Sequence, residues 1–372
     1  MRIVVDLLGY TGGRGGTETY ARELLRRLPD RVPEADWVAL ANVVGAERVE
    51  AFFPGTVRVS RSVSHGKAGW AAGEVFLAER TARRVGGDLL WTPQNFGPVV
   101  RGMPRVATIH DVIYDEVRGA AAERISRGVT SWLMGRSART ADAVITISQA
   151  ARRSIIERLK VDPSRIRVVH NGASAPPLQP GPDALSRWKV PGRRSVVLSV
   201  GNRMPHKNFD GLLRAIAAID PSRRPYTVIP GADPSSDPLR PLIETLGLQT
   251  DVLLPGWVSD AELEALYAVA DVYVCPSLAE GFGLPIIDAM ARGCRVVAHD
   301  IPVLREVGGD VATYADARRP SALAEAILGA TDTPTSVAEK SRAATHAATF
   351  SWDSAAAETA EVLVETCTSA RR

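Results

Sequence analysis

Short apolar runs that alternate with helical patterns limit the folds open to this chain. Residues 3–7, 106–109 and 143–147 have the apolar character of strands, and residues 17–28 and 148–159 have the period of a helix. Short buried strands joined by helices are typical of parallel sheets with helices on both faces. The sequence therefore predicts an α/β fold built from doubly wound parallel sheets.

A proline-rich stretch at residues 173–182 separates two such series, and it favours a linker because proline interrupts helices and central strands. The alternation resumes at residues 195–200, 208–217, 226–229, 260–269, 272–275, 285–292 and 295–298. A length of 372 residues fits about two domains of roughly 150 residues each. We predict Rossmann-like domains at residues 1–175 and 190–350 that face a ligand-binding cleft.

Composition excludes several classes of protein. The chain is 45% hydrophobic and 23% charged, as in soluble globular proteins. No apolar run approaches the roughly 20 residues of a membrane span, and the start lacks a cleavage-site pattern. Three cysteines are too few for a disulfide framework or a zinc site. We predict a cytoplasmic protein.

Charge divides the chain into a basic and an acidic part. Residues 1–172 carry 26 Lys and Arg against 18 Asp and Glu, whereas the remainder carries 19 against 24. A basic first half suits an anionic acceptor or an anionic membrane surface. We expect no nucleic-acid partner.

A helical stretch at residues 123–139 is the candidate for membrane contact. Its apolar residues are Ile125, Val129, Trp132 and Leu133, and its basic residues are Arg124, Arg127, Arg136 and Arg139. We favour an ordinary helix packed on its sheet. Peripheral contact with the inner face of the membrane stays open as the alternative.

Five glycines cluster between Gly9 and Gly16, after the first predicted strand and before the first predicted helix. Glycine lets the backbone approach a ligand, and the free N–H groups of a helix start favour an anion. The spacing is not the dinucleotide fingerprint, so NAD binding is disfavoured. A tight turn alone, with Glu18 complementing the helix dipole, is the alternative.

Two cations follow the strand at residues 195–200. Arg203 and Lys207 lie at its carboxyl end, where a diphosphate would sit. No two aspartates in the sequence are separated by a single residue, so an Asp-x-Asp metal grip is absent. We predict that the cations hold a diphosphate without a metal, with a solvated loop as the alternative.

Two carboxylates flank the segment that follows the strand at residues 272–275. Pro285 suits the first turn of a helix, and Gly281 and Gly283 expose amides just before it. Glu280 and Asp288 would repel phosphate, so we predict that they accept hydrogen bonds from sugar and ribose hydroxyls. The alternative is a helix cap with an acid in the first turn.

His110 follows the strand at residues 106–109. A lone histidine in such a place is more often structural, but its position at the carboxyl end of a strand favours a role in the site.

Taken together, the segments 12–18, 203–208, 256–260 and 280–285 resemble the retaining GT-B glycosyltransferases of family 4, in particular the bacterial mannosyl- and glucosyltransferase-like members of group 1. The resemblance covers nearly the whole chain. It implies an acceptor-binding N-terminal domain, a donor-binding C-terminal domain, and a last helix, residues 351–372, that packs back on the N-terminal domain.

The resemblance also implies site residues. Those implied for catalysis are His110, Arg203, Lys207 and Glu280. Those implied for the donor are Gly15, Gly16, Gly201, Asn202, Trp257, Val258, Gly281, Phe282, Gly283, Leu284 and Asp288. Those implied for the acceptor are Gly13, Thr17 and Glu18. The family usually has glutamate where this chain has Asp288, which is one methylene shorter.

These implications amount to a retaining hexose transfer from a nucleotide diphosphate sugar, such as GDP-mannose or a UDP-hexose, with no metal or other cofactor. The acceptor is a hydroxyl on a glycan, a lipid-linked glycan or a natural product, and the proton acceptor is a phosphate oxygen of the donor. Two alternatives remain: a nucleotide-sugar epimerase of similar architecture and a non-catalytic nucleotide-sugar binding protein.

Overall fold

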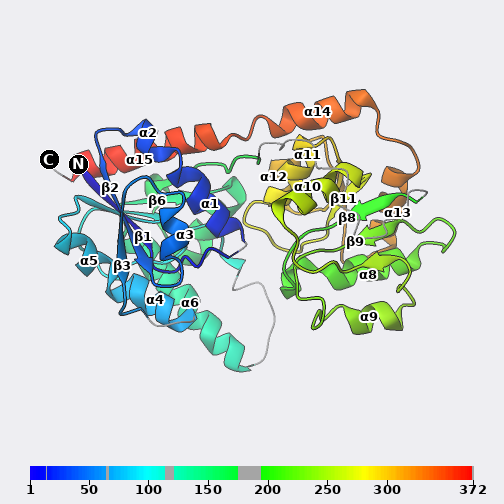
Figure 1. Cartoon of the computed structure of the whole chain (residues 1–372), viewed down its shortest axis with the longest axis horizontal. Helices are drawn as coiled ribbons and strands as arrows, with labels where there is room; N and C mark the ends of the chain where they lie inside the picture. Colours follow the sequence, from blue (N-terminus) through cyan, green and yellow to red (C-terminus); the bar gives the residue numbers. More distant parts are fainter. Residues whose placement is uncertain (14, 64–66, 114–120, 175–193, 371–372) are drawn as a thin grey trace. The chain divides into compact units, whose positions relative to one another are not determined.

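The computed structural model describes residues 1–13, 15–63, 67–113, 121–174 and 194–370. The chain forms two compact units, one of residues 1–172 and 351–372 and the other of residues 173–350 (Figure 1). Each unit contains a parallel sheet with helices around it, so the predicted fold class is confirmed.

In its described part, the first unit has a seven-stranded parallel sheet in the order β3-β2-β1-β4-β5-β6-β7. Its strands are β1 (Arg2–Leu7), β2 (Asp36–Asn42), β3 (Thr56–Ser60), β4 (Leu89–Thr92), β5 (Arg105–Thr108), β6 (Ala143–Thr146) and β7 (Ile166–Val168). Its helices are α1 (Gly16–Leu25), α2 (Leu28–Arg31), α3 (Ala46–Glu50), α4 (Lys67–Phe76), α5 (Ala78–Arg84), α6 (Ala121–Thr140), α7 (Gln149–Ser154) and α15 (Trp352–Ser369).

The last helix of the chain belongs to this first unit. Helix α15 packs against β4, β5 and β6 and lies beside α1 and α2 (Figure 1). Its buried face is rich in alanine, which allows close packing, and also contains Trp352 and Leu363. The prediction that the C-terminal helix packs back on the N-terminal domain is therefore confirmed.

Two predicted helices are interrupted. The stretch 17–28 ends as α1 at Leu25, and Pro29 lies in the first turn of the separate helix α2. The stretch 148–159 continues from α7 into a π-helical turn, Ile155–Leu159, which ends at the left-handed Lys160.

Helix α6 packs on the sheet, as the favoured interpretation of this stretch expected. Met134 and Ala138 are buried in a cluster with Val144 of β6. Val129 and Trp132, two of the apolar residues noted in the sequence, are 54% and 57% exposed and so lie outside the packed face. The side chains of Arg124, Ile125 and Arg127 lie outside the described residues. Contact with β6 determines which face of α6 is buried, and the composition of the helix does not reveal this contact.

The second unit has a six-stranded parallel sheet in its described part, in the order β10-β9-β8-β11-β12-β13. Its strands are β8 (Val196–Leu198), β9 (Tyr226–Val228), β10 (Val252–Leu253), β11 (Val272–Cys275), β12 (Arg295–His299) and β13 (Thr313–Ala315). Its helices are α8 (Phe209–Ala218), α9 (Arg240–Thr245), α10 (Asp260–Val269), α11 (Leu284–Ala291), α12 (Pro302–Gly308), α13 (Pro320–Thr331) and α14 (Val337–Ala347).

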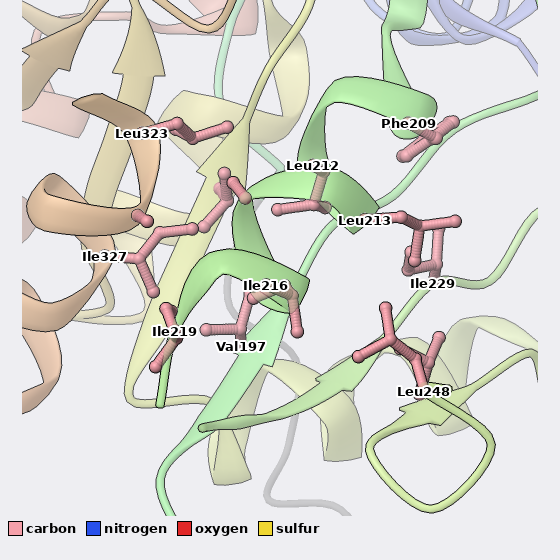
Figure 2. Close-up of a cluster of buried hydrophobic side chains, with 14 of the residues drawn as sticks. Val197, Phe209, Leu212, Leu213, Ile216, Ile219, Ile229, Leu248, Leu323 and Ile327 are labelled. Atoms are coloured by element: carbon pink, nitrogen blue, oxygen red, sulfur yellow. The ribbon is translucent and has the colours of Figure 1, made fainter. Parts of the chain in front are cut away.

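Helices α8 and α13 pack together over this second sheet. Figure 2 shows Leu212 and Ile216 of α8 in one cluster with Val197 of β8 and with Leu323 and Ile327 of α13. The spacing of four residues along each helix places these side chains on one face. This packing holds the start of α8, and so the end of the β8–α8 loop, in a fixed position.

Candidate donor site and family

The loops that follow β8 and β11 meet at one edge of the second sheet. The two strands are parallel neighbours, so their carboxyl ends lie side by side. The backbone N–H of Leu278 donates to the carbonyl oxygen of His206 at 2.7 Å, and Asn208 Nδ2 donates to the carbonyl oxygen of Pro276 at 3.2 Å. These bonds join the loops that carry the predicted donor-site residues.

Lys207 and Glu280 form an ion pair across these loops. Lys207 Nζ donates to Glu280 Oε1 at 2.7 Å, and the two side chains are 19% and 12% exposed. The structure thus brings together two residues that are 73 positions apart in the sequence and that were predicted for one site. The partial exposure leaves the pair open to a ligand.

Asn208 anchors the turn that carries Lys207. It ends the 3₁₀ turn Pro205–Lys207 in the left-handed conformation, with φ 53°, and begins α8. Its Nδ2 also donates to the carbonyl oxygen of Ala317 at 3.0 Å. Asn208 was not among the predicted site residues. Asparagine is one of the few residues that tolerate the left-handed conformation, so its place after Lys207 could have indicated this turn.

Arg203 has different surroundings from Lys207. Its side chain is 8% exposed and pairs with Asp237, whose side chain is fully buried. Nε and Nη2 donate to the Asp237 carboxylate, while Nη1 and Nη2 also donate to the carbonyl oxygens of Gly201, Ile229 and Pro230. All five N–H donors of the guanidinium are therefore engaged. Contact of Arg203 with a diphosphate stays a prediction.

Asp237, the partner of Arg203, was not predicted as a site residue from the sequence. It lies 34 positions from Arg203, and nothing in the local pattern links the two residues.

Three glycine-containing loops approach one another at the same edge of the sheet. A side chain at Gly231, which has φ +115°, would place its Cβ 2.2 Å from the carbonyl oxygen of Gly201. The N–H of Gly231 donates to the carbonyl oxygen of Gly256 at 3.0 Å. Asn202 accepts from the N–H of Met204 at 3.2 Å. This close approach requires glycine and aligns the loops after β8, β9 and β10.

The loop after Gly256 carries two of the residues implied to bind the donor. Trp257 is 51% exposed and Val258 is buried. The loop ends at a capping box, in which the Ser259 side chain and Glu262 satisfy each other's backbone N–H groups at the start of α10.

Helix α11 begins at the end of the loop that contains Glu280. Gly283 precedes the helix in the left-handed conformation, with φ 103°, and Pro285 lies in the first turn. Phe282 is buried against the edge of Phe350, with ring centroids 5.7 Å apart, which holds the loop down. Pro285 has no N–H, and the N–H of Ile286 donates to the carbonyl oxygen of Gly283 at 2.8 Å. The helix dipole still makes this end of α11 favourable for an anion. Gly281 and Leu284 lie directly before and after Phe282 and Gly283 in the sequence.

Asp288 contacts the backbone of Ser174. Its Oδ1 accepts from the N–H of Ser174 at 2.8 Å. Burial raises the pKa of Asp288 to about 6, although the Ser174 N–H and the charge of Arg292 oppose the shift. The carboxylate is thus partly committed within the protein, and its contact with a ribose stays a prediction.

The glycine-rich loop of the first unit is closed by Glu18. Its Oε1 accepts from the N–H and the hydroxyl of Thr11, at 3.0 and 2.9 Å. Gly15 caps α1 without a side-chain bond, and Gly16 is the first residue of the helix. Gly13 is exposed and Thr17 is half-buried, whereas Arg14 lies outside the described residues.

His110 is held by its neighbours in the first unit. Its side chain is buried, its ring Nε2 donates to the carbonyl oxygen of Pro93 at 2.7 Å, and its backbone N–H donates to Asn95 Oδ1 at 2.6 Å. Burial lowers the pKa of His110 to about 4, although the Pro93 carbonyl opposes the shift. The imidazole is therefore neutral at physiological pH.

Two further properties hold for the residues that the structure describes. No group of three or more His, Cys, Asp and Glu side chains among them is arranged to hold a metal ion. None of the helices formed by these residues has the length and apolar character needed to cross a bilayer.

Two family models match the chain. The model described as Glycosyltransferase Family 4 matches residues 14–175, and the model described as Glycosyl transferases group 1 matches residues 184–348. Together they span both parallel-sheet units. The chain belongs to the group 1, family 4 glycosyltransferases of the GT-B fold.

Individual relatives agree with this assignment. A D-inositol 3-phosphate glycosyltransferase of Catenulispora acidiphila is 29% identical over 395 aligned residues, which cover 95% of this chain and 90% of that protein. An MMP alpha-(1->4)-mannosyltransferase of Mycolicibacterium hassiacum is 31% identical over 274 residues, covering 70% of this chain and 65% of that protein.

Solved structures share the fold. Sucrose-phosphate synthase of Thermosynechococcus elongatus superimposes with a TM-score of 0.74 at 18% identity, covering 99% of both chains. HepE of Anabaena, solved in complex with UDP and glucose, has a TM-score of 0.73 at 20% identity and covers 98% of this chain and 100% of that chain.

Proposed function

We propose that this glycosyltransferase moves a hexose from a nucleotide diphosphate sugar to an acceptor hydroxyl, with retention at the anomeric carbon and without a metal. The observation that carries the proposal is the pair of Lys207 and Glu280, 2.7 Å apart, on the loops that follow β8 and β11. The pair lies on the same loop system as the start of α11 at Gly283.

The chemistry of transfer assigns a role to each group. Breaking the bond between sugar and nucleotide leaves negative charge on the diphosphate, which Lys207 and the positive end of the α11 dipole stabilise. Glu280 orients Lys207 and accepts hydrogen bonds from the sugar hydroxyls. Arg203 supports the backbone of the loop, and it would have to leave Asp237 to donate to the ligand.

Relatives support the choice of substrates. The two relatives named above are a mannosyltransferase and an inositol phosphate glycosyltransferase, and HepE holds UDP and glucose. The donor we propose is a GDP- or UDP-linked hexose, and the acceptor is a glycan, a lipid-linked glycan or a natural product. The net positive charge of residues 1–172 suits an anionic acceptor, which Gly13, Thr17 and Glu18 would contact.

Retention agrees with the properties of His110. Burial lowers the pKa of His110 to about 4, so its imidazole is a weak general base. We propose that an oxygen of the departing diphosphate accepts the proton of the acceptor hydroxyl, so that no protein base is needed.

A donor screen followed by product analysis tests the function. Thermal shift with UDP-, GDP-, ADP- and dTDP-linked hexoses identifies the donor, and incubation with an acceptor panel before and after chelator treatment measures transfer. We expect a product that keeps the anomeric configuration and activity that survives the chelator. Strict metal dependence would contradict the metal-free mechanism, and conversion of the donor without any acceptor would indicate an epimerase.

A further inference from the structure

The donor site contains a second basic side chain next to Lys207. His206 lies in the same 3₁₀ turn, Pro205–Lys207, and its carbonyl oxygen is held by the N–H of Leu278 on the loop after β11. Its side chain is half-buried at the point where the two loops meet.

One nitrogen of the His206 imidazole has no hydrogen-bond partner among the described residues. This nitrogen, Nδ1, is shielded from solvent. A buried polar atom is nearly always hydrogen-bonded when its role is structural. By contrast, the buried His110 donates its ring proton to Pro93, and His346 bonds the carbonyl oxygen of Val307 at 2.8 Å.

Of the two predicted phosphate-binding cations, Arg203 has no N–H donor left for a ligand. Because its five donors are engaged by Asp237 and by backbone carbonyls, it offers a phosphate nothing in this arrangement. A diphosphate at Lys207 would still need hydrogen bonds to its remaining oxygens. Of the two side chains next to Lys207 along the chain, Asn208 already donates to Pro276 and Ala317, which leaves His206.

We propose that the imidazole of His206 is a second phosphate-binding group of the donor site, acting beside Lys207. The inference rests on the proposed donor site and adds a residue to it. The ring turns an N–H toward an oxygen of the diphosphate, which gives its uncommitted polar edge a partner. The charged groups that act on the ring are Lys207 and Glu280.

Charge favours this contact once the ligand has arrived. Burial and the charge of Lys207 lower the pKa of His206, and Glu280 opposes the shift. In the free protein the ring is therefore neutral at pH 7 and does not repel Lys207. A bound diphosphate adds negative charge and favours the protonated imidazole, whose hydrogen bond to phosphate is charge-assisted.

Calorimetric titration with a nucleoside diphosphate and with the matching nucleoside tests the inference. The probe is whichever of UDP, GDP, ADP and dTDP binds the wild-type chain. We compare His206→Phe, which keeps an aromatic ring without a donor, with His206→Arg, which keeps a donor and a charge. Met204→Ala is the matched control, because Met204 lies in the same loop with its side chain 47% exposed.

We expect His206→Phe to weaken diphosphate binding about tenfold or more and to leave nucleoside binding unchanged. The diphosphate affinity of His206→Arg should stay within about threefold of the wild-type value, and that of Met204→Ala should equal the wild-type value. Equal losses for diphosphate and nucleoside, or full affinity in His206→Phe, would overturn the inference. If Lys207→Ala weakens binding and His206→Phe does not, the donor site stands and only this inference fails. If none of the four diphosphates binds the wild type, both proposals fail.

Discussion

At the scale of single residues, Lys207 and Glu280 restrain each other. The ion pair keeps the ammonium group over the loop, and the carboxylate is the acceptor that a sugar hydroxyl would meet. A diphosphate that binds Lys207 competes with Glu280 for it. We therefore expect Lys207 to act on the diphosphate and Glu280 to act on the sugar that is transferred.

Replacement of Glu280 should separate binding from transfer. In Glu280→Ala we expect transfer to be lost while the nucleoside diphosphate still binds, because the carboxylate contacts the sugar and Lys207 gains freedom to meet the phosphate. Calorimetry and initial rates on the same preparation measure the two effects. Unchanged transfer kinetics would remove Glu280 from the site.

Replacement of Lys207 should impair the chemical step. A hydrogen bond to a charged group contributes about 1.5–3 kcal/mol, so Lys207→Ala should lower turnover by roughly tenfold or more. Turnover at saturating donor measures this, with Lys340→Ala as a control on the exposed face of α14. Turnover close to the wild-type value would argue against the role of Lys207.

A buried acid pair in the first unit should make stability depend on pH. Asp6 of β1 and Glu74 of α4 are 1% and 4% exposed. Burial raises the pKa of Asp6 to about 7 and that of Glu74 well above its usual value, and the charge of Asp6 raises the pKa of Glu74 further. The folded state therefore binds more protons than the unfolded chain, and stability falls as pH rises from about 4 toward 7.

The variant Asp6→Asn should lose less stability than the wild type as the pH rises. It keeps the oxygen that accepts from the N–H of Leu8 at 3.0 Å and carries no charge. We expect its Tm to exceed that of the wild type by about 2–4 °C or more at pH 8 and to approach it as the pH falls to about 4, as followed by circular dichroism. Parallel Tm curves for the two proteins across this range would contradict the assignment.

At the scale of elements, the start of α11 depends on a left-handed residue. A Cβ at Gly283, whose φ is +103°, would lie 3.0 Å from Leu304 Cδ2. We expect Gly283→Ala to destabilise the fold by about 1–2 kcal/mol and to weaken diphosphate binding, because the first-turn N–H groups move. Urea unfolding and calorimetry measure the two effects.

Gly329→Ala is the control for that substitution. Gly329 lies within α13, and a Cβ there would meet no atom within 4 Å. Alanine should raise stability by about 0.5–1 kcal/mol at this helical position and leave ligand binding unchanged. A loss of ligand affinity in the control would mean that the effect of Gly283→Ala is not local.

Elements with local signals were predicted best. The strand at residues 272–275 and the helix at residues 260–269 have the bounds that the sequence indicated. The capping box at Ser259 and Glu262 begins that helix through contacts within a few residues. Helix α6 was predicted, but its packed face was not, because the choice between Trp132 and Met134 depends on β6.

At the scale of the whole molecule, the first compact unit contains both the beginning of the chain, residues 1–172, and its end, residues 351–372. Trp352 and Leu363 of α15 are buried, and the helix covers β4, β5 and β6. A chain ending at Phe350 would expose that face of the sheet. We expect calorimetry of the truncated chain to show a lower Tm or loss of the transition that belongs to the first unit, while the second unit unfolds as in the full chain.

Hydrogen exchange would assign those transitions to their strands. Amides of β4 and β5 should lose protection in the truncated chain, and amides of β8 and β11 should keep it. Full protection of β5 without α15 would contradict the role of this helix.

The sequence by itself determined the alternation of strands and helices, the helix starts, and the positions of Lys207, Glu280 and the glycines at the ends of strands. Each of these depends on residues close together in the chain, where side-chain period, capping and backbone conformation act. The tertiary structure alone decided that Arg203 pairs with Asp237, that Nδ1 of His206 has no hydrogen-bond partner among the residues described, and that Met134 rather than Trp132 is buried. These outcomes depend on which distant groups compete for the same buried space and the same hydrogen bonds, and that competition exists only in the folded chain.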